Sequence, residues 1–174
     1  MNIDGMSEET LEKFVDSGYI HQFADIYHLK DYEDEIVSTK GFGRKSFDNF
    51  IESIDNSRNT EAYRVIFGLG ISNIGLTNAK MLCHQYNDDI YALIKSTKDD
   101  LVKIDGVGEI IADSFVNYFA DENNMEEFNN LLKEINIKKS ESVSLANDNI
   151  TNKTFVITGS LNHYENRDAL KNYI

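Results

Sequence analysis

The feature that most constrains the fold of this 174-residue chain is an internal repeat with a period of about 65 residues. The segment Asp25–Leu29, Asp-Ile-Tyr-His-Leu, recurs as Asp-Ile-Tyr-Ala-Leu at Asp89–Leu93. An ungapped alignment of 36–54 with 101–119 preserves the apolar pattern. It matches Val37, Gly41, Gly43, Asp48 and Phe50 with Val102, Gly106, Gly108, Asp113 and Phe115. Self-similarity of this kind predicts two copies of one supersecondary unit.

Each copy has the pattern of helices. Ser7 can cap a helix whose first turn is acidic and whose apolar face is Leu11, Phe14 and Val15, with Gly18 at its end. Apolar residues at helical spacing follow Gly43 and Gly108, and the chain contains no proline to interrupt them. These residues are Phe47, Phe50, Ile51 and Ile54 in the first copy and Ala112, Phe115, Val116 and Phe119 in the second. The spacing predicts an all-α domain over residues 1–137.

The pattern changes towards the C-terminus. Residues 138–152 lose the apolar periodicity and are typical of a polar linker. Within 153–174, Thr154–Thr158 has the composition of a strand, and a helix is expected to start near Arg167.

Short turns precede four of the predicted helices. They are Gly5-Met6-Ser7, Gly41-Phe42-Gly43, Asn73-Ile74-Gly75 and Gly106-Val107-Gly108. Glycine and asparagine accept a positive φ angle, which a tight turn of this kind needs. The free amides of such a turn and of the helix that follows point the same way, which favours binding of an anion.

A turn of this kind between two helices is a helix-hairpin-helix motif. In order and spacing, the four turns resemble the consecutive hairpins of bacterial NAD-dependent DNA ligases. Lys153–Leu161 and Arg167–Ala169 resemble the opening of the BRCT domain that ends those enzymes. The resemblance implies two (helix-hairpin-helix)₂-like halves followed by a truncated α/β stub. It also implies binding of nicked duplex DNA along the minor groove, without reading of base sequence.

The resemblance and the turn pattern together predict the DNA-contacting residues. We expect the strongest phosphate contacts at the second and third hairpins. Ser7 and its acidic surroundings disfavour a phosphate at the first hairpin, and Glu109 disfavours one at the fourth. The expected contacts are Gly5, Gly41, Gly43, Arg44, Lys45, Asn73, Gly75, Lys80, Gly106 and Gly108.

We expect no catalytic centre in this chain. Lys103-Ile104-Asp105-Gly106 matches the Lys-x-Asp-Gly acceptor of AMP in DNA ligases, but the repeat alignment places it in a hairpin. The lone cysteine, Cys83, cannot form a multi-cysteine zinc site with residues of this chain. The resemblance implies that the parent enzyme uses NAD, Mg and Zn in domains absent here, so this chain should be inactive alone.

Composition leaves two other function classes open. Thirty acidic residues against 17 basic ones give a net charge of −13, which favours a non-catalytic hairpin module that binds protein. A repair glycosylase is a third hypothesis, with no base-binding pocket identified. No segment is apolar enough to span a membrane and the start is unlike a signal peptide, so we expect a cytoplasmic location.

Several conspicuous residues have structural explanations. We expect Tyr27 and Tyr91 to pack in the core, and Cys83 to be buried beside a surface His84. His21 and His28 lack a third metal ligand in the sequence pattern, and the acidic clusters are expected to be solvated.

Overall fold

A computed structural model describes residues 3–39 and 42–138, all within one compact unit, Met1–Ser140. Gly41, most of the predicted linker and the whole predicted BRCT stub lie outside the described residues. The helices up to the middle of the unit are α1 (Glu8–Asp16), η1 (Phe23–Tyr32, a 3₁₀ helix), α2 (Glu33–Ser38) and α3 (Arg44–Ser57). After β1 (Asn59–Glu61) come α4 (Ala62–Gly68), α5 (Leu76–Gln85), α6 (Ile90–Leu93), α7 (Lys98–Leu101), α8 (Glu109–Ala120), α9 (Glu122–Glu134) and β2 (Asn136–Lys138).

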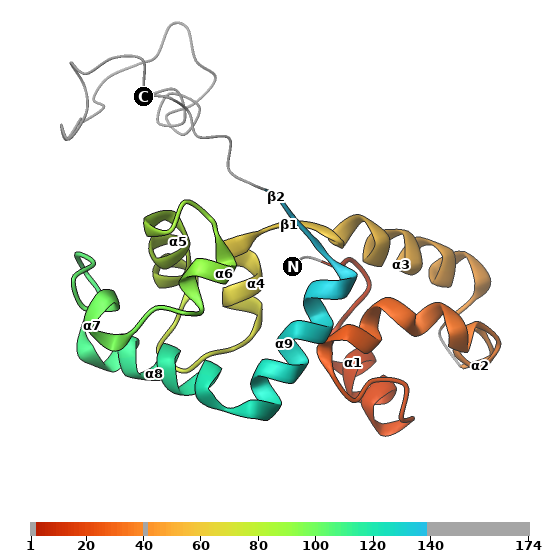
Figure 1. Cartoon of the computed structure of the whole chain (residues 1–174). Helices are drawn as coiled ribbons and strands as arrows, with labels where there is room; N and C mark the ends of the chain where they lie inside the picture. The colour runs from red at the N-terminus through yellow and green to blue at the C-terminus, as the bar shows by residue number, and fades with distance from the viewer. Residues whose placement is uncertain (1–2, 40–41, 139–174) are drawn as a thin grey trace, which may run out of the picture. The chain divides into compact units, whose positions relative to one another are not determined.

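The helices form two groups within this unit. Helices α1 to α3 gather on one side, α4 to α8 gather on the other, and α9 runs between them (Figure 1). Helix α9 packs against η1 of the first group and against α8 of the second. It therefore connects the two groups, although it follows both in the sequence.

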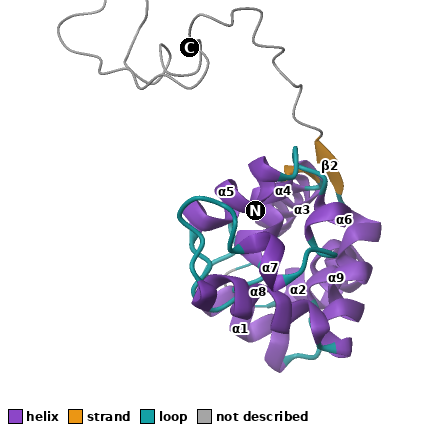
Figure 2. Ribbon diagram, turned by 60° about the vertical axis from the view of Figure 1, so that its left-hand side comes forward, coloured by secondary structure: helices purple, strands orange, loops and turns teal. Residues whose placement is uncertain are grey.

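The fold is mostly helical but includes a small sheet that the all-α prediction lacked. Strands β1 and β2 pair in parallel, with Asn59 opposite Asn136 and Thr60 opposite Ile137. The strands are drawn in orange in Figure 2. Three-residue strands are too short to show an alternating pattern in the sequence. Their pairing depends on the path of the intervening helices, which form the crossover that a parallel pair requires.

The predicted helical core is confirmed at most of its positions. Phe47, Phe50 and Ile54 are buried on α3, and Ala112 and Phe115 are buried on α8. These residues belong to one continuous apolar cluster with residues of the other helices, such as Leu29, Leu82, Leu93 and Phe128. Within the described ranges, no helix is long and apolar enough to cross a membrane.

Helix α1 follows the prediction at its ends but only in part on its apolar face. The Ser7 hydroxyl accepts a hydrogen bond from the Thr10 amide at 3.2 Å, and Gly18 follows the helix at φ +74°. Phe14 is buried, whereas Leu11 and Val15 are 37% and 49% exposed. The prediction was wrong for these two, because α1 lies at the edge of the bundle and buries a narrower stripe than its sequence offers.

The paired tyrosines of the repeat differ in burial. Tyr27 is buried as predicted, and its hydroxyl lies 3.2 Å from Ser57 Oγ. Tyr91 is 58% exposed on the short helix α6, so its predicted core position was wrong. The two environments differ because α3 and α9 pack against η1, which holds Tyr27. These contacts join segments that lie far apart in the sequence.

Candidate nucleic-acid interface

The four predicted hairpins share one backbone hydrogen bond. In each, the amide of the central apolar residue donates to the carbonyl three residues earlier, which defines a β-turn. The bonds run from Met6 to Ile3 at 3.3 Å, Phe42 to Thr39 at 3.0 Å, Ile74 to Ile71 at 3.1 Å and Val107 to Ile104 at 3.0 Å. Four segments of different sequence thus share this hydrogen bond.

The residue before the central apolar residue has a positive φ where the structure describes it. The angle is +87° at Gly5, +65° at Asn73 and +83° at Gly106. This is the third residue of a type II turn, where glycine and asparagine are favoured. The left-handed conformation predicted for these three positions is therefore present, and Gly41 is the corresponding residue of the second turn.

The helix that follows each turn starts in the same extended conformation. Its N-cap has φ between −78° and −87° and ψ between 162° and 177° at Ser7, Gly43, Gly75 and Gly108. Any residue can adopt these angles, and a Cβ added to any of the three glycines would meet no heavy atom within 4 Å. Internal packing therefore does not require glycine at the start of α3, α5 or α8.

The glycine N-caps leave helix amides uncovered. None of the three described glycine-capped helices receives a hydrogen bond from a capping side chain. By contrast, α6, α7 and α9 are capped by the side chains of Asp89, Thr97 and Asp121. Free amides carry the positive end of the helix dipole, so each glycine N-cap favours an anion and allows it to approach closely.

The first and second hairpins pack on each other's helices. A Cβ on Gly5 would lie 3.4 Å from the Phe50 ring of α3, and the Asp4 amide donates to Ser53 Oγ at 2.7 Å. In the opposite direction, the Phe42 ring contacts Phe14 of α1, with ring centroids 5.9 Å apart. The two hairpins therefore form one packed pair.

The third and fourth hairpins form a second, more symmetrical pair. Asn73 Nδ2 donates to Ser114 Oγ of α8 at 3.0 Å, and a Cβ on Gly106 would lie 3.3 Å from Met81 Sδ of α5. Met81 and Ser114 occupy equivalent positions when counted from Gly75 and Gly108, which start their helices. Each turn residue with positive φ thus contacts the same position of the neighbouring helix. No pattern in the sequence marks Ser114 or Met81 as the partner of a turn residue.

The second hairpin combines free amides with basic side chains. The first turn of α3 holds Arg44 and Lys45 and no acidic residue. Arg44 forms an ion pair with Glu33 and lies 3.8 Å from Asp48, with its side chain 65% exposed. Lys45 is exposed beside it.

The third hairpin has an uncharged helix start. The first turn of α5 carries no acidic residue, and Asn78 Nδ2 donates to the Asn73 carbonyl at 3.0 Å, which fixes the turn. Lys80 Nζ lies 5.0 Å from the centre of the Tyr63 ring, a cation–π contact that orients the lysine. Lys80 is exposed and is the fifth residue of α5.

The first and fourth hairpins are less suited to an anion. Glu8 and Glu9 occupy the first turn of α1, where the Ser7 hydroxyl already takes one amide. Glu109 starts α8 and lies 3.4 Å from Lys98 Nζ. Acidic side chains at these positions compensate the helix dipole internally.

The structure also describes the contacts of the other residues singled out in the sequence. Lys103 lies in the fourth hairpin, paired with Asp100 at 3.3 Å, with its side chain 73% exposed. Cys83 is buried, and burial, followed by the nearby Asp88 charge, raises the pKa of its thiol to about 12. His28 Nε2 lies 3.0 Å from Glu134, and within the described ranges no cluster of three or more His, Cys, Asp or Glu side chains could hold a metal ion.

Known proteins resemble this chain over its whole length. A model of the helix-hairpin-helix motif matches residues 64–127, which hold the third and fourth hairpins. A protein named DNA ligase from Lachnoclostridium phytofermentans is 41% identical over 174 residues, covering 100% of this chain and 26% of the relative. DNA ligases of Ruminiclostridium cellulolyticum and Fusobacterium nucleatum are 38% and 34% identical over 100% of the chain, covering 26% and 25% of the relatives. The chain thus spans about a quarter of the length of these relatives.

Proposed function

Because the chain belongs to the DNA ligase family, we propose that residues 1–137 bind nicked duplex DNA through the backbone amides of their hairpins. The domain in this proposal consists of two (helix-hairpin-helix)₂-like halves. The linker is assigned to 138–152 and the beginning of a BRCT domain to 153–174. The protein of which this chain is a part would act in the bacterial cytoplasm, in replication and repair.

The glycine N-caps of α3 and α5 carry this proposal, and the N-cap of α8 has the same geometry beside an acidic residue. They leave amides free at positions where internal packing does not demand glycine. Phosphate is the anion that duplex DNA offers at regular intervals, and amide–phosphate contacts fix a protein on DNA without reading bases. Binding independent of sequence suits an enzyme that must act at any nick.

The net charge of −13 limits where DNA can lie. The acidic starts of α1 and α8 repel phosphates, whereas the starts of α3 and α5 do not. The strongest contacts are therefore assigned to Gly43, Arg44, Lys45, Gly75 and Lys80. Gly5, Asn73 and Gly106 shape the turns that present the amides, and Gly108 starts α8. A contact at Gly41 is proposed from the repeat alignment alone.

The chemistry belongs to the parent enzyme. In this proposal, domains outside this chain use NAD to form enzyme–AMP and DNA–AMP intermediates and then join a 3′-hydroxyl to a 5′-phosphate. They also hold the Mg and Zn ions. This chain positions the nicked duplex, and alone it seals nothing.

Fluorescence anisotropy on a labelled nicked duplex tests the proposal. The wild-type chain should bind weakly, independently of sequence, with an affinity that falls as salt rises. A Gly43→Val, Gly75→Val variant should fold normally, because a Cβ has space at both positions, and should lose binding. Gly68→Val is the matched control, since a Cβ has equal space at this glycine and it starts no helix.

The acidic charge also favours a second candidate function, a hairpin module that binds protein. A folded wild-type chain that ignores nicked duplex even at low salt would support this alternative and contradict the first proposal.

A further inference from the structure

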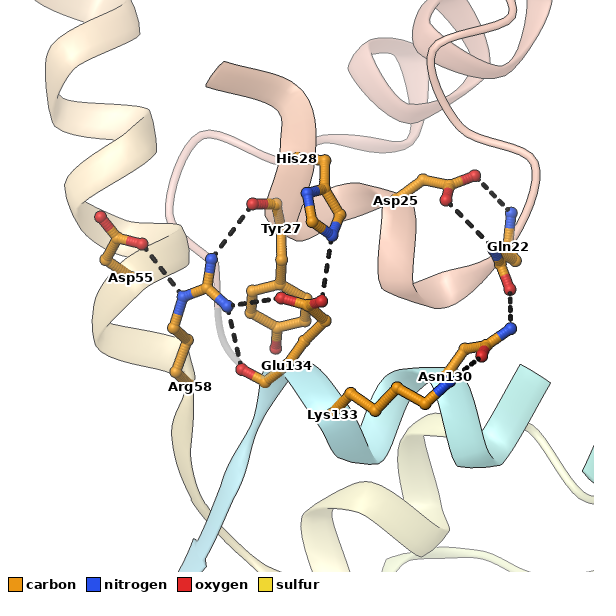
Figure 3. Close-up of polar contacts among 9 residues, drawn as sticks. All are labelled: Gln22, Asp25, Tyr27, His28, Asp55, Arg58, Asn130, Lys133 and Glu134. Carbon is orange, nitrogen blue, oxygen red and sulfur yellow. Dashed lines mark hydrogen bonds and ion pairs between the residues drawn. The ribbon is translucent and has the colours of Figure 1, made fainter. Parts of the chain in front are cut away.

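Arg58 lies at the junction of the two hairpin pairs. Helix α3 of the first pair ends at Ser57, and α4 of the second pair begins at Ala62, so Arg58 starts the connecting segment. Helix α9 follows the second pair and ends at Glu134, beside Arg58 (Figure 3). The point where the chain leaves the first pair thus meets the point where it returns from the second.

The Arg58 side chain joins the elements that meet there. One terminal nitrogen donates to both the carbonyl and the carboxylate of Glu134, at 3.0 and 2.9 Å, and the other donates to the Tyr27 carbonyl at 3.1 Å. Its Nε donates to Asp55 at 3.1 Å. The Arg58 carbonyl accepts from the Asn136 amide at 2.7 Å. One residue therefore bonds η1, α3 and α9 together.

Two further bonds connect α9 to η1 and its N-cap. Asn130 Nδ2 donates to Gln22 Oε1 at 2.9 Å, and His28 lies 3.0 Å from Glu134 (Figure 3). Helix α9, which is also packed on α8 of the second pair, is thereby attached to the first pair at two separate points along its length.

We propose that Arg58 is a positioning residue that holds the two hairpin pairs as one rigid DNA-binding body. This inference rests on the proposed function, since it concerns how the two pairs act together on DNA. When one pair has bound, the other is held near the same duplex, and its binding becomes an intramolecular step with a high effective concentration. Loss of the fixed orientation adds an ordering cost to that second step.

The geometry requires a guanidinium at this position. Arg58 directs three nitrogens at acceptors on different elements, which a lysine ammonium on a flexible stem cannot reproduce. Arg58→Lys keeps the charge and should therefore behave like Arg58→Met. This separates the positioning role from a direct electrostatic effect on DNA.

The test measures affinity against duplex length, from about one to about three helical turns of about 10 base pairs each. The wild type should bind a duplex of about two turns or more at least about 100-fold more tightly than a one-turn duplex. Arg58→Met and Arg58→Lys should bind the one-turn duplex like the wild type and lose about tenfold on the longer ones. Arg64→Met is the control, because Arg64 of α4 pairs with Glu61 at the end of β1, and this variant should show the wild-type length dependence.

Each outcome decides between the two proposals. A wild type that binds equally at all lengths, or Arg58 variants that keep the full length dependence, would overturn the positioning role while leaving DNA binding intact. Absence of wild-type binding at every length would overturn the proposed function instead.

A second variant and a second measurement cover the case in which Arg58 variants do not fold. Asn130→Ala removes the hydrogen bond between α9 and Gln22, the N-cap of η1. This variant should lose less affinity for the longer duplexes than the Arg58 variants do. Spin labels at the exposed positions of Glu12 and Lys95, in a Cys83→Ala background, report the distance between the pairs. The distance distribution should be narrow in the wild type and broader in Asn130→Ala without DNA. A distribution of unchanged width in Asn130→Ala would contradict the inference.

Discussion

Asn73 Nδ2 donates a hydrogen bond to Ser114 Oγ at 3.0 Å, so a turn residue of the third hairpin is bonded to the helix of the fourth. Asn73 has a positive φ, as glycine could have in the same turn, but its side chain also forms a hydrogen bond that glycine could not form. The bond fixes the spacing of two helix starts that carry free amides.

Loss of this bond should weaken DNA binding while the chain remains folded. Ser114→Ala and Asn73→Gly should each lower affinity for nicked duplex about three- to tenfold, because a typical hydrogen bond contributes about 1 kcal/mol. Ser114→Thr keeps the hydroxyl and should bind like the wild type. Anisotropy measures the affinities and circular dichroism checks the fold. Equal affinities in all three variants would exclude a role for the bond.

Lys45 should contribute one phosphate contact. Replacing it with Gln should lower affinity similarly on all sequences and reduce the slope of log affinity against log salt by about 1. Lys133→Gln is the control, because Lys133 lies on α9 and donates to Asn130 rather than facing a hairpin. An unchanged slope in Lys45→Gln would show that Lys45 contacts no phosphate and that DNA binds at another surface.

The buried Phe50 ring packs against the turn of the first hairpin. It is buried on α3 and contacts the turn at Gly5, so Phe50→Ala should lower the free energy of unfolding by about 3–5 kcal/mol. Val15→Ala, on an exposed side chain, should change it by less than about 0.5 kcal/mol. Urea denaturation of both variants measures these changes. Similar decreases in the free energy of unfolding for the two variants would contradict the prediction.

Glu134 should make stability depend on pH. The hydrogen bond from Arg58 lowers the pKa of Glu134 below its ordinary value, with burial opposing and His28 assisting. A carboxyl with a lowered pKa stabilises the fold above its unfolded pKa of about 4.3, and this contribution disappears as the pH falls through the lower folded value. Glu134→Gln should therefore be less stable than the wild type at pH 7, and the gap should narrow below about pH 4. A gap of constant size across this range would show that the charge of Glu134 is irrelevant.

The sequence predicted features that depend on local pattern. The turns, the positive φ at Asn73, the Ser7 cap and the buried face of α3 all follow from residues close together in the chain. Glycine at a turn or an apolar residue every three or four positions carries the same meaning in most contexts.

Features that depend on distant contacts were not predictable. The β1–β2 pair, the burial of Tyr27 but not of Tyr91, and the contacts of Arg58 all depend on the way α9 returns to η1. Arg58 follows helix α3 and looks in the sequence like a solvated charge, and its partner Glu134 lies 76 residues away. Similarly, Ser114 carries no pattern that marks it as the partner of Asn73.

The most direct test of the central claim is an amide NMR titration of the chain with nicked duplex DNA. The account predicts that the largest shifts occur at the amides that begin α3 and α5, from Gly43 to Ser46 and from Gly75 to Asn78. They should be absent in the Gly43→Val, Gly75→Val variant. Shifts confined to other surfaces, with the amides of both helix starts unchanged, would contradict it.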